Sequence, residues 1–283
     1  MLGIIGGTGI YDLPGLKITE DRAVETPFGP PSANFTMGTY GHQKVVFLAR
    51  HGKSHEFLPH EVNYRANIWA LKSLGVRRII GISAVGSLRH DLKPGDMAIA
   101  DQYFDFVKGP REKSFFGRGL AAHVSTAEPT CGNLTNLLVS AGEKMDIGVH
   151  RGTTYACVDG PRLGTRAESL FLKNAAKCDL VGMTNVPEAF LAREAQICYC
   201  TLAIVTDYDC WLDDPAEHVS VAQVISRYGA SLEKAKKLLG GFLESKAVRR
   251  EDCPCRTSLQ HAILSPEDSL SAENKSLLDL LRL

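Results

Sequence analysis

The sequence predicts a single-domain α/β fold. Two observations support this prediction. Short runs rich in Val, Ile and aromatic residues alternate with segments of helical periodicity, and Gly and Pro punctuate the whole length without a linker-like block. The chain has 283 residues, of which 44% are hydrophobic and 23% charged, as is ordinary for a globular domain. In such folds the sheet is largely buried, and ligands bind at loops beyond the strand ends.

Six segments are expected to be strands, because β-branched and aromatic residues fill them and Gly, Pro, Asn or Asp bound them. They are Leu2–Ile5, Lys44–Leu48, Arg78–Ser83, Met97–Asp101, Gly152–Val158 and Thr201–Thr206. Functional side chains are therefore sought where these strands end.

Three segments carry helical signals. Val62–Leu74 has helical spacing and is followed by Gly75, a residue that commonly ends helices. Val219–Leu243 repeats apolar residues from Val221 onward at the spacing of one helical face, so we expect a long helix packed on the core. Ser271–Leu281 is expected to be the last helix.

The charge balance excludes several classes of function. Basic and acidic residues number 32 each, so the formal net charge is zero. A neutral chain has no global field that draws it to nucleic acid or to an anionic membrane. No run of about 18 apolar residues is present to cross a bilayer. The N-terminal residues lack a basic region ahead of an apolar stretch, which argues against a signal peptide and favours the cytoplasm.

A glycine-rich loop, Gly6-Gly7-Thr8-Gly9, follows the first predicted strand. Glycines let the backbone turn tightly and bring N–H groups close to an anion, and Thr8 adds a hydroxyl donor. A dinucleotide-binding fingerprint fits badly, because Asp12 stands where Gly or Ala is needed and Pro14 interrupts the helix that should follow. The loop therefore favours a cradle for a single phosphate, with a plain tight turn as the alternative.

Other candidate anion-binding residues stand at the ends of apolar runs. They are Arg50, His51, Ser83, Ala84 and Thr184. Arginine offers a planar fork for phosphate oxygens, and small hydroxyl residues beside glycines offer short donors. Each of them alone is typical of a structural or surface role, but together they predict a site for free phosphate.

Asp207 and Asp209 follow the strand predicted at Thr201–Thr206. Residues two apart on a strand share a face, so both carboxyls are expected to point into the same small volume. Two carboxyls in a semi-buried site repel, which raises the pKa of one and lets it protonate a leaving group near neutrality. The alternatives are a cap before the turn at Asp213-Asp214-Pro215 and a metal site, for which no third ligand is suitably spaced.

A series of motifs extends from residue 3 to about residue 245. It comprises Gly3–Gly9, Thr26–Gly29, Leu48–Gly52, Val62–Leu71, Gly86–Leu88, Ala127–Pro129, Gly160–Arg162, Arg166–Ser169, Met183–Thr184, Val186–Glu188 and Thr206–Trp211. In this order the motifs resemble the 5′-deoxy-5′-methylthioadenosine phosphorylases, in the trimeric branch of the purine nucleoside phosphorylases. The resemblance implies a mixed, twisted and partly barrel-like sheet surrounded by helices over residues 1–250. It also implies a helical extension, residues 251–283, packed on the same domain.

The resemblance implies phosphorolysis of methylthioadenosine to adenine and 5-methylthioribose 1-phosphate, with phosphate as a co-substrate and without a metal or organic cofactor. It assigns phosphate contacts to Thr8, Arg50, His51, Ser83, Ala84 and Thr184. It assigns a ribose contact to Met183 and the purine contacts to Asp207 and Asp209, with Asp207 as the acid.

Two positions near the base depart from the family pattern. Leu163 stands where the family has an aromatic residue that stacks on the base, and Gly164 stands where it has Ser. The implied pocket for the methylthio group consists of Val221, Val224 and Ile225. The family also inserts a histidine from the neighbouring subunit, and His123 matches it. The resemblance thus implies a homotrimer, either alone or stacked as a dimer of trimers.

Asp207 also predicts which purine is used. A 6-amino group donates hydrogen bonds and a 6-oxo group accepts them, and the 6-oxopurine branch carries Asn where Asp207 stands. Adenine is therefore favoured. A phosphorylase of methylthioinosine or inosine is the alternative, since Asn185 replaces a Thr common in the animal-type enzymes. From other classes, a nicotinamide-dependent oxidoreductase and a non-catalytic purine-binding module are considered.

The eight cysteines include no C-x-x-C pair. Cys198 and Cys200 are expected to be buried strand residues. Cys253-Pro254-Cys255 lies in a polar stretch, and relatives from heat-loving archaea carry a similar pair as a disulfide, which suggests a structural or redox role. Two reduced thiols in a mobile tail are the alternative. A metal site is disfavoured there, because only His261 is near in sequence and no fourth ligand is evident.

Overall fold

The computed structural model describes residues 1–7, 9–10, 12–214, 218–245 and 253–283. The described strands are β1 (Leu2–Gly6), β2 (Leu16–Arg22), β3 (Phe35–Tyr40), β4 (Gln43–Ala49), β5 (Arg78–Ser87), β6 (Met97–Asp105), β7 (Val149–Cys157), β8 (Leu180–Gly182) and β9 (Cys198–Asp207). The described helices are α1 (Tyr64–Ser73), α2 (Gly132–Lys144), α3 (Arg166–Asn174), α4 (Asn185–Glu194), α5 (Val221–Glu244) and α6 (Ala272–Arg282), with the short 3₁₀ helices η3 (Pro254–Thr257) and η4 (Glu267–Ser269).

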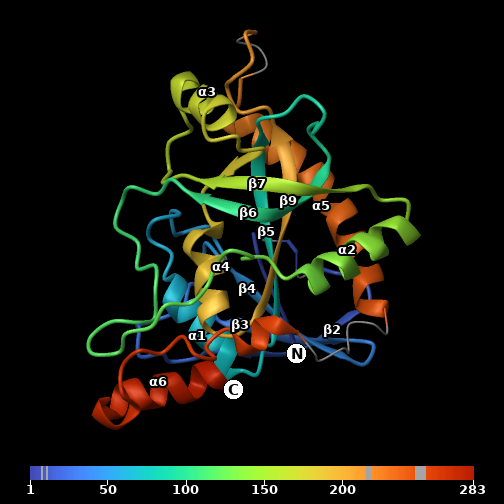
Figure 1. The fold of residues 1–283 in the computed structure, drawn as a ribbon. Helices are drawn as coiled ribbons and strands as arrows, with labels where there is room; N and C mark the ends of the chain where they lie inside the picture. The colour runs from blue at the N-terminus through green and yellow to red at the C-terminus, as the bar shows by residue number, and fades with distance from the viewer. Residues whose placement is uncertain (8, 11, 215–217, 246–252) are drawn as a thin grey trace.

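The strands form one mixed sheet that closes on itself in part. Its order is β2-β3-β4-β1-β5-β8-β7-β6-β9, and a further pairing joins β5 to β9. The last five strands in this order therefore form a closed barrel, from which β1, β4, β3 and β2 extend as an open arm (Figure 1). Strands β4, β1, β5 and β9 run parallel. The predicted α/β class and the mixed, partly barrel-like sheet are confirmed.

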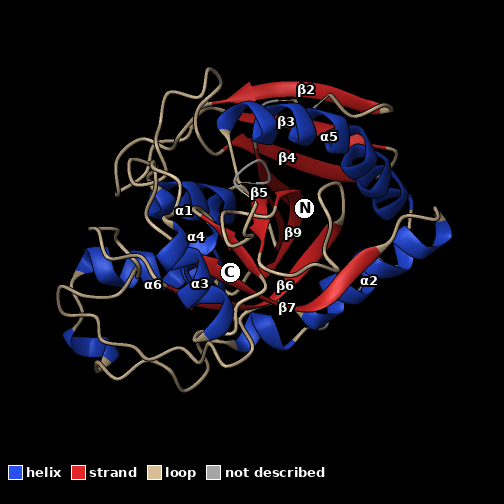
Figure 2. Cartoon of the chain, turned by 90° about the horizontal axis from the view of Figure 1, so that it is seen from above, coloured by secondary structure: helices blue, strands red, loops and turns tan. Residues whose placement is uncertain are grey.

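Helices cover the sheet on both sides. Helices α1 and α4 lie on one side, and α2 and α5 lie on the other (Figures 1 and 2). Successive residues of a strand point to opposite faces, so β1 places Ile4 in the core with α2 and α5 and Ile5 in the core with α1 and α4. Because both faces are buried, the central strands are apolar runs rather than alternating patterns. None of the described helices combines the length and apolar character needed to cross a membrane.

The predicted helices are present, and local caps fix their ends. Helix α1 begins after Asn63, whose side chain accepts a hydrogen bond from the Ala66 N–H at 3.1 Å. It ends before Gly75, where φ is 81°. Ser271 caps α6 in the same way, by accepting from the Asn274 N–H at 3.2 Å. Of these end signals, only Gly75 was used in the sequence-based prediction.

The core-facing side predicted for the long helix is only partly correct. Leu238 and Phe242 in the second half of α5 are fully buried, but Val221 and Ile225 in its first turns are 64% and 67% exposed. The apolar repeat is continuous in the sequence, yet the core of this chain underlies only the later turns of the helix. The prediction that Val221 and Ile225 pack on the core of the chain is therefore wrong.

The predicted strands are too short at the ends that matter for function. Strand β5 does not end at Ser83 but continues to Ser87, because Gly86 and Ser87 pair with β8 while Ala84 and Val85 pair with β9. The anion-binding candidates Ser83 and Ala84 are therefore part of a barrel strand and not of a loop beyond it.

The C-terminal segment packs on the side of the molecule that carries α1 and α4. Leu259, Leu270, Leu278 and Leu281 are buried in the same apolar cluster as residues of both helices. Figure 1 shows α6 running below α1. The boundary predicted at residue 250 lies outside the described residues.

Candidate active site

The predicted anion-binding residues meet at the carboxyl ends of the parallel strands. Strands β1 and β4 pair residue for residue up to Gly6, and the Arg50 N–H donates to the Gly6 carbonyl at 3.0 Å. On the other side of β1, β5 carries Ser83 at the same edge. Strand β9 follows, with Asp207 opposite Gly86. One edge of the sheet therefore holds both the phosphate candidates and the paired aspartates.

Arg50 is held by a bidentate ion pair in the core. Its Nε and Nη2 lie 2.7 and 2.8 Å from the two carboxylate oxygens of Glu188, and the two side chains are only 2% and 1% exposed. Nη1 also donates to the Ile82 carbonyl at 2.8 Å, and Nη2 to the Ile5 carbonyl at 3.5 Å. Burial opposes the charge of the guanidinium, but Glu188 outweighs this effect and raises the pKa of Arg50. Within the described residues, four of the five N–H groups are thus engaged, and one on Nη1 makes no hydrogen bond.

A buried hydrogen-bond network fixes Glu188 in turn. The Tyr199 hydroxyl donates to Oε1 of Glu188 at 2.7 Å, and Nδ2 of Asn185 donates to the Tyr199 oxygen at 2.7 Å and to the Thr201 hydroxyl at 2.9 Å. Asn185, which replaces the Thr of the animal-type enzymes, therefore belongs to the support behind Arg50. Glu188 lies in a family motif, but its role as the partner of Arg50 was not predicted.

Hydroxyl groups gather beside Arg50. The Ser83 Oγ lies 3.4 Å from the Thr184 Oγ1 and 3.5 Å from the Tyr155 hydroxyl, and it also donates to the Ala84 carbonyl at 3.3 Å. Thr184 precedes α4 as its N-cap residue, but its side chain makes no capping bond. Ser83, Ala84 and Thr184 are thus brought together as predicted, in a cluster whose hydroxyl protons can turn toward an oxyanion.

His51 follows Arg50 in the chain and carries a neutral ring. Its Nδ1 lies 2.8 Å from the Phe57 carbonyl, which can only accept, so Nδ1 carries the proton and Nε2 carries the lone pair. Burial, followed by the charge of Arg50, lowers the pKa of His51 to about 4. A neutral His51 can accept a hydrogen bond through Nε2 but cannot donate one there.

The glycine loop lies under the first part of α5. The Tyr228 hydroxyl would be 3.5 Å from a Cβ placed on Gly7, so this ring packs over the loop. Thr8 lies outside the described residues. The first regular element after the loop is β2 and not a helix. This disfavours a dinucleotide site, which needs a helix directly after its glycines.

Asp207, the last residue of β9, is 3% exposed. Its Oδ2 accepts from the Thr206 hydroxyl at 2.6 Å, and its Oδ1 accepts from the Asp209 N–H at 2.7 Å. Burial raises the pKa of Asp207 and outweighs these two hydrogen bonds, which lower it. The Asp209 carboxyl adds a smaller increase. The predicted rise in pKa is therefore found, with burial rather than Asp209 as its main cause.

The reason for the proximity of the two aspartates differs from the predicted one. Strand β9 ends at Asp207, and Asp209 lies in the following turn with a positive φ of 53°. The strand-alternation argument is therefore wrong, and the turn itself brings the two residues together. Asp209 is 7% exposed, and burial raises its pKa as well. A Cβ at Gly86 would lie 2.8 Å from the Asp207 Oδ1 and 3.1 Å from the Asp209 Cβ, so glycine there leaves room for both.

A cavity of about 160 Å³ opens beside Asp209. Apolar side chains such as Phe106 and Leu172 line it together with Gly164, and its charged lining comprises Lys108, Asp159, Arg162, Glu168 and Asp209. Gly164 is therefore near the carboxyl pair as predicted. Leu163 lies in the same loop and is 37% exposed. Phe106, the aromatic ring in this wall, was not predicted.

Arg111 organises the loop that carries Met183. Its Nη1 donates to the Met183 carbonyl at 2.8 Å and to the Val186 carbonyl at 2.8 Å, and its Nη2 donates to the Asp159 carbonyl at 2.7 Å. The Met183 sulfur packs so close to Gly160 that a Cβ there would lie 2.5 Å from it. Met183 therefore stands between the loop after β7 and the start of α4. Arg111 was missed in the sequence, because it belongs to no motif.

Within a single chain, some of the predicted site residues do not lie beside the carboxyl and hydroxyl groups described above. Val221 and Ile225 are exposed, and Val224 is half-buried beside them on α5. His123 is exposed in the loop between β6 and α2, where its N–H donates to the Ala262 carbonyl at 2.9 Å. It thus lies beside the C-terminal segment and not among the carboxyl and hydroxyl groups described above.

Comparison with known proteins identifies the family of the chain. Residues 1–244 match the Phosphorylase superfamily. An S-methyl-5′-thioadenosine phosphorylase from Geobacter sulfurreducens is 44% identical over 281 residues, which cover 99% of this chain and 97% of the relative. One from Saccharolobus solfataricus is 47% identical over 266 residues, which cover 93% and 97%.

Solved structures give the same result. A methylthioadenosine phosphorylase from an antarctic soil metagenomic library has a TM-score of 0.92 at 42% identity, with 99% of this chain and 98% of that chain covered. The Schistosoma mansoni methylthioadenosine phosphorylase in complex with adenine has a TM-score of 0.86 at 36% identity, with 95% and 99% covered. The chain therefore belongs to the phosphorylase superfamily. Within it, the chain is a member of the S-methyl-5′-thioadenosine phosphorylase family, as its motifs predicted.

Proposed function

We propose that the protein catalyses phosphorolysis of 5′-methylthioadenosine to adenine and 5-methylthioribose 1-phosphate. The observation that carries this proposal is the position of two buried carboxyls at the end of β9, on the same sheet edge as Arg50 and the hydroxyl cluster. Such an edge provides a phosphate site and an acid for a departing base. The relatives bear the name of this activity, and one solved relative is in complex with adenine.

Phosphate binds between Arg50, Ser83 and Thr184, with Thr8 and Ala84 completing the contacts. The free N–H of Arg50 and the two hydroxyls donate to phosphate oxygens. The neutral His51 accepts a hydrogen bond from the O–H of monohydrogen phosphate through Nε2, because its Nδ1–H already donates to a carbonyl. Phosphate held in this way is positioned for the anomeric carbon, and positioning of this kind accounts for several kcal/mol of a typical barrier, roughly 7–11 at most.

Asp207 acts on the leaving base. Breaking the glycosidic bond builds positive charge on the sugar and negative charge on the purine. A protonated Asp207 donates its O–H to purine N7, which neutralises the leaving group, while phosphate captures the sugar cation. Burial favours the protonated form of Asp207. Proton donation by a positioned acid contributes roughly 10²–10⁴ to the rate.

The same carboxyl selects the purine. A protonated carboxyl presents one O–H donor and one carbonyl acceptor side by side. The donor matches N7, and the acceptor matches the hydrogen of a 6-amino group. A 6-oxo group would place two acceptors against each other. Adenine nucleosides are therefore preferred, and the alternative activity on methylthioinosine or inosine is not favoured.

The remaining contacts are supplied by residues that the chain leaves exposed or half-buried. Met183 contacts the ribose, Val224 with Val221 and Ile225 holds the methylthio group, and His123 enters the site of a neighbouring subunit. The exposure of Val221, Ile225 and His123 supports this assignment, because residues that serve a subunit interface are uncovered in one chain. The assembly that follows is a homotrimer in the cytoplasm, with a role in purine and methionine salvage and no cofactor in the reaction.

A substrate panel tests this function. Initial rates are measured for methylthioadenosine, adenosine, methylthioinosine and inosine over a range of phosphate concentrations. Methylthioadenosine is expected to have the highest kcat/KM, and both 6-oxopurine nucleosides the lowest. A higher kcat/KM for inosine than for adenosine would overturn the role given to Asp207.

A further inference from the structure

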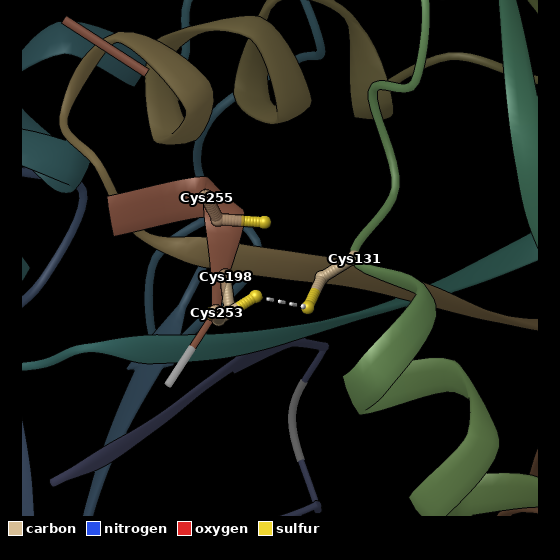
Figure 3. Close-up of side chains that lie close together, drawn as sticks. All are labelled: Cys131, Cys198, Cys253 and Cys255. Carbon is tan, nitrogen blue, oxygen red and sulfur yellow. Dashed lines mark hydrogen bonds between the residues drawn. The ribbon is translucent and has the colours of Figure 1, made fainter. Parts of the chain in front are cut away.

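Four cysteines from distant parts of the chain meet at one place. Cys131 is the N-cap residue of α2, Cys198 is the first residue of β9, and Cys253 and Cys255 lie at the start of η3. Their four sulfur atoms all lie within 4.8 Å of one another, and those of Cys131 and Cys253 are 3.4 Å apart. Figure 3 shows the side chains converging from the strand, the helix and the C-terminal segment.

We propose that Cys131, Cys198, Cys253 and Cys255 form a structural zinc site that fastens the C-terminal segment to the phosphorylase domain. Zinc takes four thiolates in a tetrahedron at about 2.3 Å, which sets the sulfur atoms about 3.8 Å apart. The observed separations require shifts of only about 1 Å to reach that geometry. An all-thiolate set is also the donor chemistry that selects zinc over hard cations.

The surroundings suit a negatively charged centre. The Leu134 N–H, in the first turn of α2, points at the Cys131 sulfur at 3.4 Å, and the positive end of a helix stabilises a thiolate. Arg256 follows Cys255 directly, and its Nε is buried without a hydrogen-bond partner among the described residues. Zinc with four thiolates carries two negative charges, which would attract this half-buried guanidinium.

The arrangement fits one metal better than two independent disulfides. Every sulfur is close to the other three, whereas separate disulfides need only pairwise proximity. A disulfide between Cys253 and Cys255 would also close a very small loop, which offers little entropic benefit. The sequence-based objection to a metal, that no further ligand accompanies Cys253 and Cys255, is wrong because Cys131 and Cys198 are brought in from the domain.

The site acts on the fold and not on the reaction. Cys198 and Asp207 stand at opposite ends of β9, and nine residues of strand span roughly 30 Å. Zinc binding displaces the protons of the four thiols and adds bonds that exist only in the folded chain. We therefore expect zinc to raise the melting temperature without changing kcat.

The experiment measures metal content and thiol state together. The full chain is purified under reductant without added chelator, and its zinc is quantified by plasma mass spectrometry. Accessible thiols are titrated before and after a zinc chelator. The test variant is Cys253→Ser/Cys255→Ser, and the matched control is Cys178→Ser, a buried cysteine outside the cluster. Cobalt is then added to metal-free protein, since tetrahedral cobalt thiolate has a distinct visible spectrum.

The expected result is about one zinc per chain in the wild type and the control, and none in the double variant. The chelator should release four thiols and lower the Tm by roughly 5–15 °C. The double variant should keep its kcat. Reduced, metal-free wild type that fails to bind micromolar zinc would overturn the proposal. So would two intact disulfides in protein kept under reductant, or an iron chromophore in place of zinc.

Discussion

The ion pair between Arg50 and Glu188 allows a sharp test of how the phosphate site is built. We predict that Glu188→Gln both destabilises the protein and weakens phosphate binding. The substitution keeps the shape of the side chain but removes the charge that faces the buried guanidinium at 2.7 and 2.8 Å. Arg50 then remains charged in a site where it is 2% exposed, without its counter-ion.

The magnitude follows from burial. Removing one partner of a buried, hydrogen-bonded pair costs about 3–5 kcal/mol of unfolding free energy. For 283 residues the unfolding entropy is about 0.6 kcal/mol/K, so the Tm should fall by ~5–8 °C. In the variant, the guanidinium of Arg50 is also no longer held in place by the bidentate ion pair with Glu188. The KM for phosphate should therefore rise by ~10-fold or more, with a smaller change in the KM for the nucleoside.

The assay is thermal unfolding together with steady-state kinetics at varied phosphate. Glu20→Gln is the matched control, because Glu20 makes a similar bidentate pair with Arg22 at the surface, where both side chains are 46% exposed. Exposed ion pairs contribute little to the free energy of unfolding, so the control variant should leave the Tm and the KM for phosphate unchanged. The reasoning is refuted if Glu188→Gln matches the control in Tm and in the KM for phosphate.

Three other predictions follow from the same structure. Asp207→Asn should lower kcat/KM for methylthioadenosine and raise the relative use of methylthioinosine, since a mismatched buried hydrogen bond costs ~1–3 kcal/mol; side-by-side kinetics on the two nucleosides check this. The kcat/KM for methylthioadenosine should exceed that for adenosine by no more than about 10², and Ile225→Asn should reduce this ratio. Equal kcat/KM values for the two nucleosides in the wild type would contradict the assignment of an apolar pocket for the methylthio group. Burial raises the pKa of Glu194 from the ordinary 4.5 to about 7. The folded protein therefore holds this proton more tightly than the unfolded chain does. The stability that follows from this difference is fully present below pH 4.5 and is lost as the pH rises through 7. Glu194→Gln should therefore raise the Tm at about pH 8 but not at about pH 5, and a pH-independent shift in melting curves would contradict the assignment.

The sequence predicted those parts of the fold that depend on local patterns. Apolar runs such as Leu2–Ile5 identify strands buried on both faces, and Gly75 marks the end of α1. Strand β2 was not predicted because its residues after Leu16 are exposed and, apart from Ile18, polar, which weakens the apolar signal. Helix α3 was not predicted either, although its capping box of Thr165 and Glu168 is visible in the sequence.

The site could be predicted only as far as it depends on strand ends. Arg50 and Asp207 stand at such ends and Ser83 lies level with the end of β1, and parallel pairing brings all three to one edge. The partners that hold them were missed, because Glu188 and Arg111 meet their contacts through tertiary packing that no periodicity encodes. The cysteine cluster was missed for the same reason, since its members come from α2, β9 and the C-terminal segment.

The most direct test of the central claim is product analysis with phosphate as the only variable. Methylthioadenosine is incubated with the protein with and without phosphate, adenine is quantified by chromatography, and the sugar product is identified by phosphorus NMR. We predict that adenine and 5-methylthioribose 1-phosphate form in equal amounts, and only when phosphate is present. Release of adenine without phosphate, or with free methylthioribose as the sugar product, would contradict a phosphorolytic site at this edge of the sheet.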